Sequence, residues 1–409
     1  MLESIALVGL DVHQAQSVAA VLDPVSGELR VERLRGAPGD VVPVFLEGLG
    51  RPVRAVYEAG PTGFALAREA IARGLDLRPV SPGSIPKAPG DRVKTDRRDA
   101  KRLVRLFAAG ELSFSFVPSE AEEHFRDLVR CIDDARTDLM RSRHRLSKFL
   151  LRRGLRFAGR AWTQPHQRWL GKVAFDDALS RAVLIDYCVA IDALVHRRRE
   201  LILVLEDAAG KSSHAQTIAR LRCFRGINTL TAAGLCAEVS NFERFAKPAL
   251  LSGFRGIVPS EYTSSDKRVQ GHITKAGPTH ARRLLVESAH HYRRRPRVSI
   301  ELAARQAGQD PRVVAVAWRA QRRLYSRWAH LGGERGKPTG TVAVAVAREL
   351  AAFCWEAATL NCRAPTSTPA CRRLPGRARA TMKAANVATQ RARAQGLWAT
   401  QLRLGGARS

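Results

Sequence analysis

The chain has 409 residues, 45% of them hydrophobic, which is enough to bury the cores of two or three domains. Its 68 Lys and Arg against 38 Asp and Glu give a formal net charge of +30, so we expect a polyanionic partner, with nucleic acid the first candidate. We expect no membrane span, signal peptide or lipid anchor, which argues against a membrane-surface protein and predicts a cytoplasmic, nucleoid-associated one. The seven cysteines contain no CxxC pair, so neither a disulfide framework nor a zinc site is expected.

Residues 1–115 are predicted to form an α/β domain. Short apolar or alternating runs, separated by turn-forming residues, are typical of strands, and longer periodic runs are typical of helices. The expected strands span residues 4–12, 17–23, 28–34, 54–60 and 76–81. Helices are expected at 39–49 and 63–74, and one more follows the fifth strand. This order predicts a mixed sheet that opens with a three-strand meander and is flanked by helices.

Residues 116–212 are predicted to form long helices. Two stretches, 119–153 and 176–208, carry apolar residues three and four positions apart. Both an antiparallel hairpin and a dimer coiled coil fit this periodicity. Long helices of this kind suggest a homo-oligomer, at least a dimer, and two DNA duplexes would suit a tetramer.

Residues 213–358 are predicted to form a compact and mostly helical domain. Its "RGIN" segment (225–228) resembles a helix-hairpin-helix turn, in which backbone N–H groups face a phosphate. Asn228 stands where such turns usually have a second glycine, and Asn tolerates a left-handed conformation. Residues 359–409 carry no acidic residue, and we expect a basic tail that is disordered when free.

Four carboxylates are expected to meet at one edge of the sheet. Asp11 ends the first strand, Glu58 ends the fourth, and Asp96 and Asp99 begin the helix after the fifth. Clustered like charges need a cation, and hard carboxylate oxygens select Mg²⁺ or Mn²⁺. Such ions polarise a phosphodiester. The basic residues of "VKTDRRDAKRL" (93–103) would then hold a nucleic-acid backbone beside the metal.

Each of these carboxylates also has an ordinary structural explanation. Asp96 and Asp99 fit a capping pair at a helix N-terminus, where anions are favoured in any protein. Asp11 could begin a turn and Glu58 could be a loop residue. The set is more specific than its members, because an RNase H-like nuclease carries its acids on these same elements.

At this point the sequence resembles the DEDD insertion-sequence transposases, which join a RuvC-like N-terminal domain to a serine-bearing C-terminal domain. The resemblance lies in "GLDVH", "YEAGPTG", "KTDRRDAKRL" and "FRGIVPSEYTSSDKRVQGHITKAGPTHARRLLVESA", and it extends over about residues 4–356. It implies an RNase H-like (RuvC-like) mixed sheet, followed by long helices and a mostly α-helical C-terminal domain. It also implies DNA strand exchange in which an element-encoded RNA guides the recognition of donor and target DNA.

The resemblance carries the DEDD set to Asp11, Glu58, Asp96 and Asp99, as metal ligands and catalytic residues, and the family's nucleophilic serine to Ser264. Ser265 replaces the glycine that usually follows, so Ser265 is the alternative position for the serine. A serine is a poor nucleophile until its proton is removed or the developing charge is stabilised, which the metal ions could do. The expected product is a covalent phosphoserine link that conserves bond energy for rejoining.

Lys and Arg near these two centres are predicted to contact nucleic-acid phosphates, although charged faces of this kind are more often simply solvated. They are Lys94, Arg97, Arg98, Lys267, Arg268, Lys275, Arg282 and Arg283. Two alternatives to a recombinase stay open. One is a Mg²⁺-dependent RuvC-like nuclease or junction resolvase that acts by hydrolysis, and the other is a non-catalytic nucleic-acid-binding protein.

Overall fold

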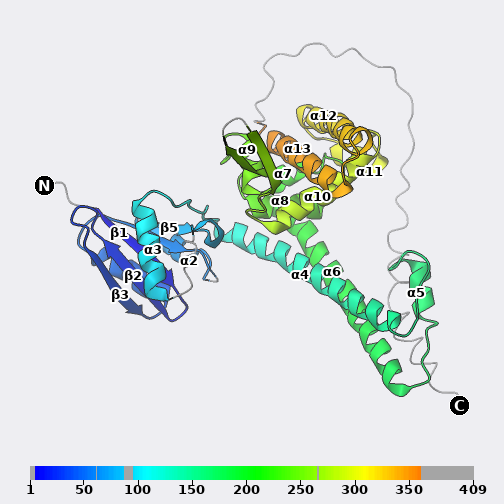
Figure 1. The fold of residues 1–409 in the computed structure, drawn as a ribbon, viewed down its shortest axis with the longest axis horizontal. Helices are drawn as coiled ribbons and strands as arrows, with labels where there is room; N and C mark the ends of the chain where they lie inside the picture. Colours follow the sequence, from blue (N-terminus) through cyan, green and yellow to red (C-terminus); the bar gives the residue numbers. More distant parts are fainter. Residues whose placement is uncertain (1–4, 61, 87–94, 265–266, 361–409) are drawn as a thin grey trace, which may run out of the picture. The chain divides into compact units, whose positions relative to one another are not determined.

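A computed structural model of the chain describes residues 5–60, 62–86, 95–264 and 267–360 (Figure 1). The contacts divide the chain into two compact units, Met1–Glu123 and His124–Ser409. The predicted tail, 359–409, lies outside the described residues from position 361 onward. No described helix is long and apolar enough to cross a membrane.

The first unit contains a five-stranded mixed sheet. Its strands are β1 (Ala6–Val12), β2 (Gln16–Leu22), β3 (Leu29–Arg35), β4 (Val53–Glu58) and β5 (Asp76–Val80). The spatial order is β3-β2-β1-β4-β5, with β1, β2 and β3 antiparallel and β4 parallel to both β1 and β5. The predicted three-strand meander and mixed sheet are confirmed, and the arrangement is consistent with an RNase H-like fold.

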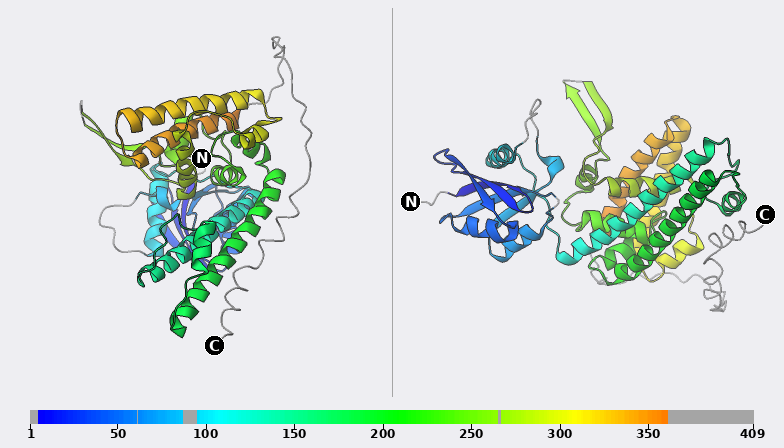
Figure 2. Two further views of the ribbon diagram at one scale, coloured as in Figure 1. Left: turned by 90° about the vertical axis from the view of Figure 1, so that its right-hand side faces the viewer. Right: turned by 90° about the horizontal axis from the view of Figure 1, so that it is seen from below.

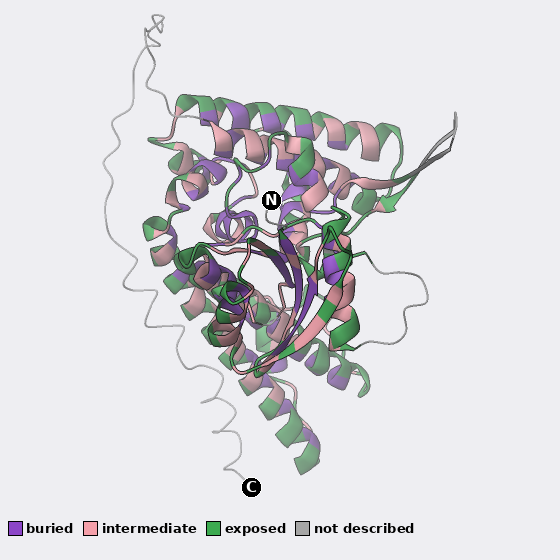
Figure 3. Ribbon diagram, turned by 90° about the vertical axis from the view of Figure 1, so that its left-hand side faces the viewer, coloured by how far each residue is buried: buried purple, intermediate pink, exposed green. Residues whose placement is uncertain are grey.

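Helices cover both faces of this sheet. On one face, α1 (Pro38–Glu47) and α2 (Ala65–Ala72) bury Val42 and Leu66 against alternate side chains of the strands. On the other face, α3 (Asp96–Ala108) packs Ala100 and Val104 against β2. The central strands are buried from both sides, whereas the helices keep an exposed outer surface (Figure 3). A short helical turn, Pro82–Ser84, follows β5.

Two long helices form an antiparallel hairpin in the second unit. They are α4 (Glu120–Leu151) and α6 (Ala178–Lys211), and the short helix α5 (Gln164–Leu170) lies between them in the chain. The start of α4 packs with the end of α6, as Val129 does with Leu205, and the end of α4 packs with the start of α6, as Phe149 does with Leu184. The two helices lie side by side (Figure 2). The predicted long helices are confirmed, and within one chain they pair as a hairpin.

The rest of the second unit is a helical bundle with one β-hairpin. Its helices are α7 (Ala215–Leu221), α8 (Thr229–Val239), α9 (Pro248–Phe254), α10 (Thr279–Ala289), α11 (Ile300–Gln306), α12 (Pro311–Trp328) and α13 (Thr339–Thr359), with helical turns at His290–Arg293 and Ala329–Glu334. The strands β6 (Pro259–Ser264) and β7 (Lys267–Ile273) pair antiparallel.

A buried carboxylate ties the long hairpin to this bundle. Glu238 on α8 accepts hydrogen bonds from Arg130 on α4, at 3.3 Å, and lies 3.4 Å from His280 Nδ1 on α10. Burial alone would raise the pKa of Glu238, but the hydrogen bonds from His280 and Arg130 lower it to about 2. The carboxylate is therefore ionised in the folded protein, and it joins three helices.

The turn before α8 differs from the prediction in detail. Gly226 has a left-handed backbone, with φ +81°. Asn228 is extended instead, and its side chain caps α8 by accepting a hydrogen bond from the Thr231 N–H. An amide side chain competes well for this capping position, which explains why asparagine is accommodated here without a left-handed conformation.

Candidate active site

Two parallel strands and one helix bring the four predicted carboxylates to the same edge of the sheet. β1 and β4 run parallel with Leu10 opposite Tyr57, so Asp11 and Glu58 follow next to each other at the carboxyl ends of their strands. α3 begins at Asp96 and carries Asp99 in the same first turn. The site is thus built within the first unit, from segments distant in sequence.

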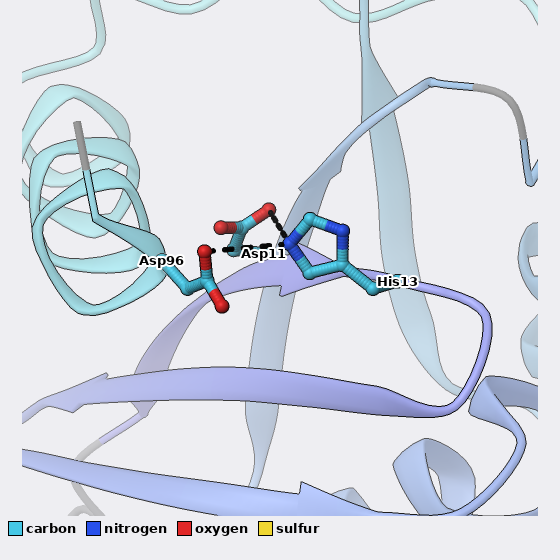
Figure 4. Close-up of side chains that lie close together, drawn as sticks. All are labelled: Asp11, His13 and Asp96. Carbon is cyan, nitrogen blue, oxygen red and sulfur yellow. Dashed lines mark ion pairs between the residues drawn. The ribbon is translucent and has the colours of Figure 1, made fainter.

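These side chains form one continuous acidic cluster. The residues lining a small pocket at this edge are Leu10, Asp11, Glu58, Ile85, Asp99, Arg102 and Leu103. Asp96 joins Asp11 around His13, whose Nε2 lies 3.5 Å from Asp11 Oδ1 and 3.6 Å from Asp96 Oδ1. One ligand atom from each of these three residues lies within 4.8 Å of the others, and the three side chains point toward one another (Figure 4).

The electrostatics of the cluster favour a bound cation. Burial raises the pKa of Asp11, and the nearby Asp96 and Asp99 raise it further, whereas His13 opposes them. A divalent ion among these oxygens would relieve the repulsion that the acids impose on each other. The donor set is dominated by carboxylate oxygens, so it fits Mg²⁺ or Mn²⁺.

The side-chain cap of α3 comes from Thr95 and not from the two aspartates. The N-cap is Thr95, whose side chain accepts a hydrogen bond from the Arg98 N–H. Asp96 and Asp99 occupy the first turn, where the helix dipole favours anions. Their side chains are available to the cluster, and Asp99 also lies 3.4 Å from the guanidinium of Arg102.

Gly9 sets how close α3 comes to the sheet. A Cβ atom at Gly9 would lie 2.6 Å from the Val104 backbone N and 2.7 Å from the Ala100 backbone O. Only glycine therefore allows the helix backbone to rest directly on β1, two residues before Asp11. This contact holds the first turn of α3 beside the strand ends.

His13 was not selected from the sequence, and Arg102 was expected beside the site only as one of the basic residues of 93–103, not next to the acids. His13 follows Asp11 by two residues, and in an extended chain such residues point to the same side. Arg102 follows Asp99 by three residues, which places both on one side of a helix. These spacings were the available signals.

The serine predicted as nucleophile lies in the second unit. Ser264 is the last residue of β6, where its backbone pairs opposite Lys267 at the start of β7. The strands β6 and β7 form a β-hairpin. Ser265, the alternative nucleophile, and Lys94 lie outside the described residues. Arg268 is in β7, and its role as a phosphate ligand stays a prediction.

The base of this β-hairpin is tightly packed against α9. Gly256 and Gly277 both have left-handed backbones, and a Cβ at Gly277 would lie 1.8 Å from the Phe254 backbone O. Arg282 on α10 donates hydrogen bonds to the backbone oxygens of Arg255 and Ala276, both at 3.0 Å. The chain on either side of β6 and β7 is therefore fixed to the bundle.

The remaining predicted phosphate ligands are placed differently from one another. Arg97 and Arg98 are exposed on the first turn of α3, and Lys275 is exposed with a left-handed backbone, φ +56°. Arg283 is engaged within the protein, because it pairs with Asp133 on α4 at 2.5 Å and with Glu287 at 2.9 Å. Contact of these cations with nucleic acid stays a prediction.

The chain is similar to known transposases. Residues 218–302 match a family described as "Transposase IS116/IS110/IS902 family". The chain is 36% identical over 361 residues to a putative transposase, y4qE, of Sinorhizobium fredii, covering 86% of this chain and 87% of that protein. It is 30% identical over 337 residues to the transposase for insertion sequence element IS1533 of Leptospira borgpetersenii, covering 81% of this chain and 97% of that protein.

Proposed function

The chain belongs to the transposase IS116/IS110/IS902 family, and from this membership we propose that it cuts and rejoins DNA strands of a mobile element through a metal-assisted serine nucleophile. The observation that carries the proposal is the convergence of Asp11, Glu58, Asp96 and Asp99 at one sheet edge. A polynucleotide partner agrees with the net charge of +30.

In this proposal the four carboxylates hold Mg²⁺ or Mn²⁺, which when bound supplies positive charge to a phosphodiester. Asp11, Glu58 and Asp99 would hold the ion, together with Asp96 from the first turn of α3. Arg97 and Arg98, exposed beside Asp96, hold the DNA backbone.

Ser264 forms the covalent link. Its hydroxyl loses a proton as the Oγ–P bond forms, the bond from phosphorus to the leaving deoxyribose oxygen breaks, and that oxygen takes up a proton. The phosphoserine ester keeps the bond energy for attack by a new DNA end. Because the acids and Ser264 lie in different units, the reaction requires both units to reach one phosphate.

A structured RNA from the element guides the choice of DNA in this proposal, and the active form is a homo-oligomer. The first point rests on the likeness to DEDD transposases in motifs of both units, and the second on the long α4 and α6 helices. RNA that copurifies with the protein and restores site-specific joining when added back would support guidance.

A second candidate function is metal-dependent hydrolysis, and one observation favours it. All four acids lie in the first unit, so a nuclease would need nothing from Ser264. Ser264→Ala should abolish strand joining while a purely hydrolytic enzyme would keep cutting. Removal of Mg²⁺ should stop either reaction, whereas a protein that only binds nucleic acid would be unaffected.

The decisive experiment is mass spectrometry of the protein incubated with its flanking DNA and Mg²⁺, then denatured and trimmed with nuclease. A nucleotide adduct on Ser264 is the expected result. An adduct on Ser265 would move the nucleophile by one residue. No adduct on residues 263–266, with Mg²⁺-dependent cutting intact, would establish the hydrolytic nuclease.

A further inference from the structure

The far end of the α4–α6 hairpin carries a long, positively charged stretch of sequence that is free of acidic residues. Between Asp138 and Asp176 the chain contains no Asp or Glu. Lys and Arg recur throughout this stretch, and nearly all of them are exposed. The exposed ones are Arg141, Arg145, Lys148, Arg152, Arg153, Arg156, Arg160, Arg168 and Lys172. This segment, residues 139–175, is called the arm end below.

A separate small core gives the arm end a defined shape. Leu146, Phe149 and Leu170 are buried with Leu184 and Ile191 of α6, apart from the core of the helical bundle. The connection between α4 and α6 includes α5, which lies beside the far ends of both helices (Figure 1). The arm end is therefore a packed element rather than a simple turn between two helices.

Aromatic side chains of the arm end pack on one another. His166 is buried, with its ring 5.0 Å from Trp162, 5.1 Å from Phe157 and 5.6 Å from Trp169. The guanidinium of Arg143 lies 4.8 Å from the Trp162 ring centroid. These rings are used for packing, so they are poorly placed to stack on splayed bases, as proteins that bind single strands require.

Two of these exposed cations form a hydrogen bond or an ion pair with other described residues. Arg153 donates hydrogen bonds to the Phe149 backbone O and Ser180 Oγ, and Arg141 lies 3.5 Å from Asp138. The others form no ion pair with a carboxylate of the described residues. Seven cations on one small packed element, none of them in an ion pair within the described residues, repel each other unless an anion lies across them.

We propose that the arm end is a second DNA-binding surface, which holds the phosphate backbone of duplex DNA and uses none of the carboxylate cluster's residues. Three observations favour a duplex backbone: the cations are exposed, acidic side chains are missing from this stretch of sequence, and the aromatic rings are packed inward. Binding of this kind is independent of base sequence and depends steeply on salt. It relies on DNA being the substrate, but it does not rely on Ser264 or on metal.

The test neutralises four cations of the arm end together, Arg152→Gln, Arg156→Gln, Arg160→Gln and Arg168→Gln. Binding of a fluorescent duplex from the element end is measured by anisotropy across a salt series in EDTA, so no strand is cut. Each lost phosphate contact reduces the steepness of log K against log salt by about 0.9. We therefore expect the slope to become shallower by roughly 2 to 4, and binding near 0.1 M salt to weaken by at least about tenfold.

A matched control removes the same charge elsewhere in the second unit. It replaces four exposed cations of the helical bundle, Lys247, Arg322, Arg335 and Lys337, by Gln. The slope should change by less than about one. Equal losses in the two variants would show that only net charge matters, and the proposal would be wrong.

Two further comparisons make the result decisive. Replacing the same four arginines by Lys keeps the charges, so this protein should bind duplex with the parent slope, and a loss there would refute an electrostatic surface. The Gln variant is also measured against a structured RNA of similar length. A loss confined to RNA would assign the arm end to RNA and overturn the proposal. Because all these assays lack metal, failure of the proposed chemistry cannot produce or hide any of these outcomes.

Discussion

The close contact of α3 with β1 makes Gly9→Ala a direct test of how the carboxylate cluster is assembled. The new Cβ would lie 2.6 Å from the Val104 backbone N, whereas ordinary van der Waals contact begins at 3.4 Å, so α3 must move away by about 0.8 Å. The obstructing atoms belong to helix backbone, which cannot rotate aside as a side chain would. The displacement carries Asp96 and Asp99 away from Asp11.

Two measurable losses should follow from Gly9→Ala. Overpacking of this kind costs about 1–3 kcal/mol of folding free energy, which should lower the melting temperature. A shift of nearly 1 Å between catalytic groups costs on the order of 100-fold in rate. We therefore expect Mg²⁺-dependent cleavage of element-end DNA to fall about this much at a temperature where the variant is fully folded, and to need more Mg²⁺ for half-maximal rate.

Gly39→Ala is the matched control for this experiment, because a Cβ at Gly39, in α1, meets no atom within 4 Å. It should leave both cleavage and Mg²⁺ dependence at the parent values. The reasoning would be refuted if Gly9→Ala cut DNA at the parent rate with the parent Mg²⁺ requirement. The spacing between α3 and β1 would then have no bearing on the acids.

Three further variants test other parts of the structure. Gly277→Ala places a Cβ 1.8 Å from a backbone oxygen of α9 at φ +67°, so it should destabilise the second unit, whereas a Cβ at Gly253 meets nothing and Gly253→Ala should be tolerated in thermal melts. The pKa of Glu238 is about 2 in the folded protein against the ordinary 4.5, so its ionised carboxylate stabilises the folded state above pH 4.5, and this stabilisation is lost as the pH falls toward 2. In urea unfolding, Glu238→Gln should remove this part of the pH dependence of stability. Thr95→Ala removes the cap of α3 at a cost of about 1 kcal/mol and should weaken Mg²⁺ binding, measured by titration calorimetry, whereas loss of the α6 cap in Asp177→Ala should not.

Much of the first unit could be predicted because its signals are local. The strand β1, which carries Asp11 near its end, is a largely apolar run. The helix α3, which packs on it, repeats buried residues at Ala100, Leu103, Val104 and Phe107. The edge position of the acids then follows from the general geometry of parallel strands. The packing of α3 at Gly9 could not be predicted, since it depends on a contact between segments far apart in sequence.

The β-hairpin that carries Ser264 shows why other features stayed hidden. Its strands contain mostly polar residues and no clear alternation of apolar and polar positions, so they read as a loop. What fixes the hairpin lies outside it, in the glycine contacts with α9 and in the hydrogen bonds of Arg282. Local sequence therefore carries little of the information that determines this element.

The helix α3 separates the two acids of "TDRRDAKRL" from Arg97 and Arg98, although Asp99 lies 3.4 Å from Arg102. At 3.6 residues per turn, Asp96 and Asp99 share the side that also carries the buried Ala100 and faces the strand ends, while Arg97 and Arg98 point to solvent. One helical turn thus presents carboxylates inward and cations outward. If the acids bind metal, a DNA backbone held by Arg97 and Arg98 lies beside the ion, and these arginines do not neutralise the carboxylates. A helix that binds both a metal ion and a DNA backbone therefore requires acidic and basic residues mixed in its sequence.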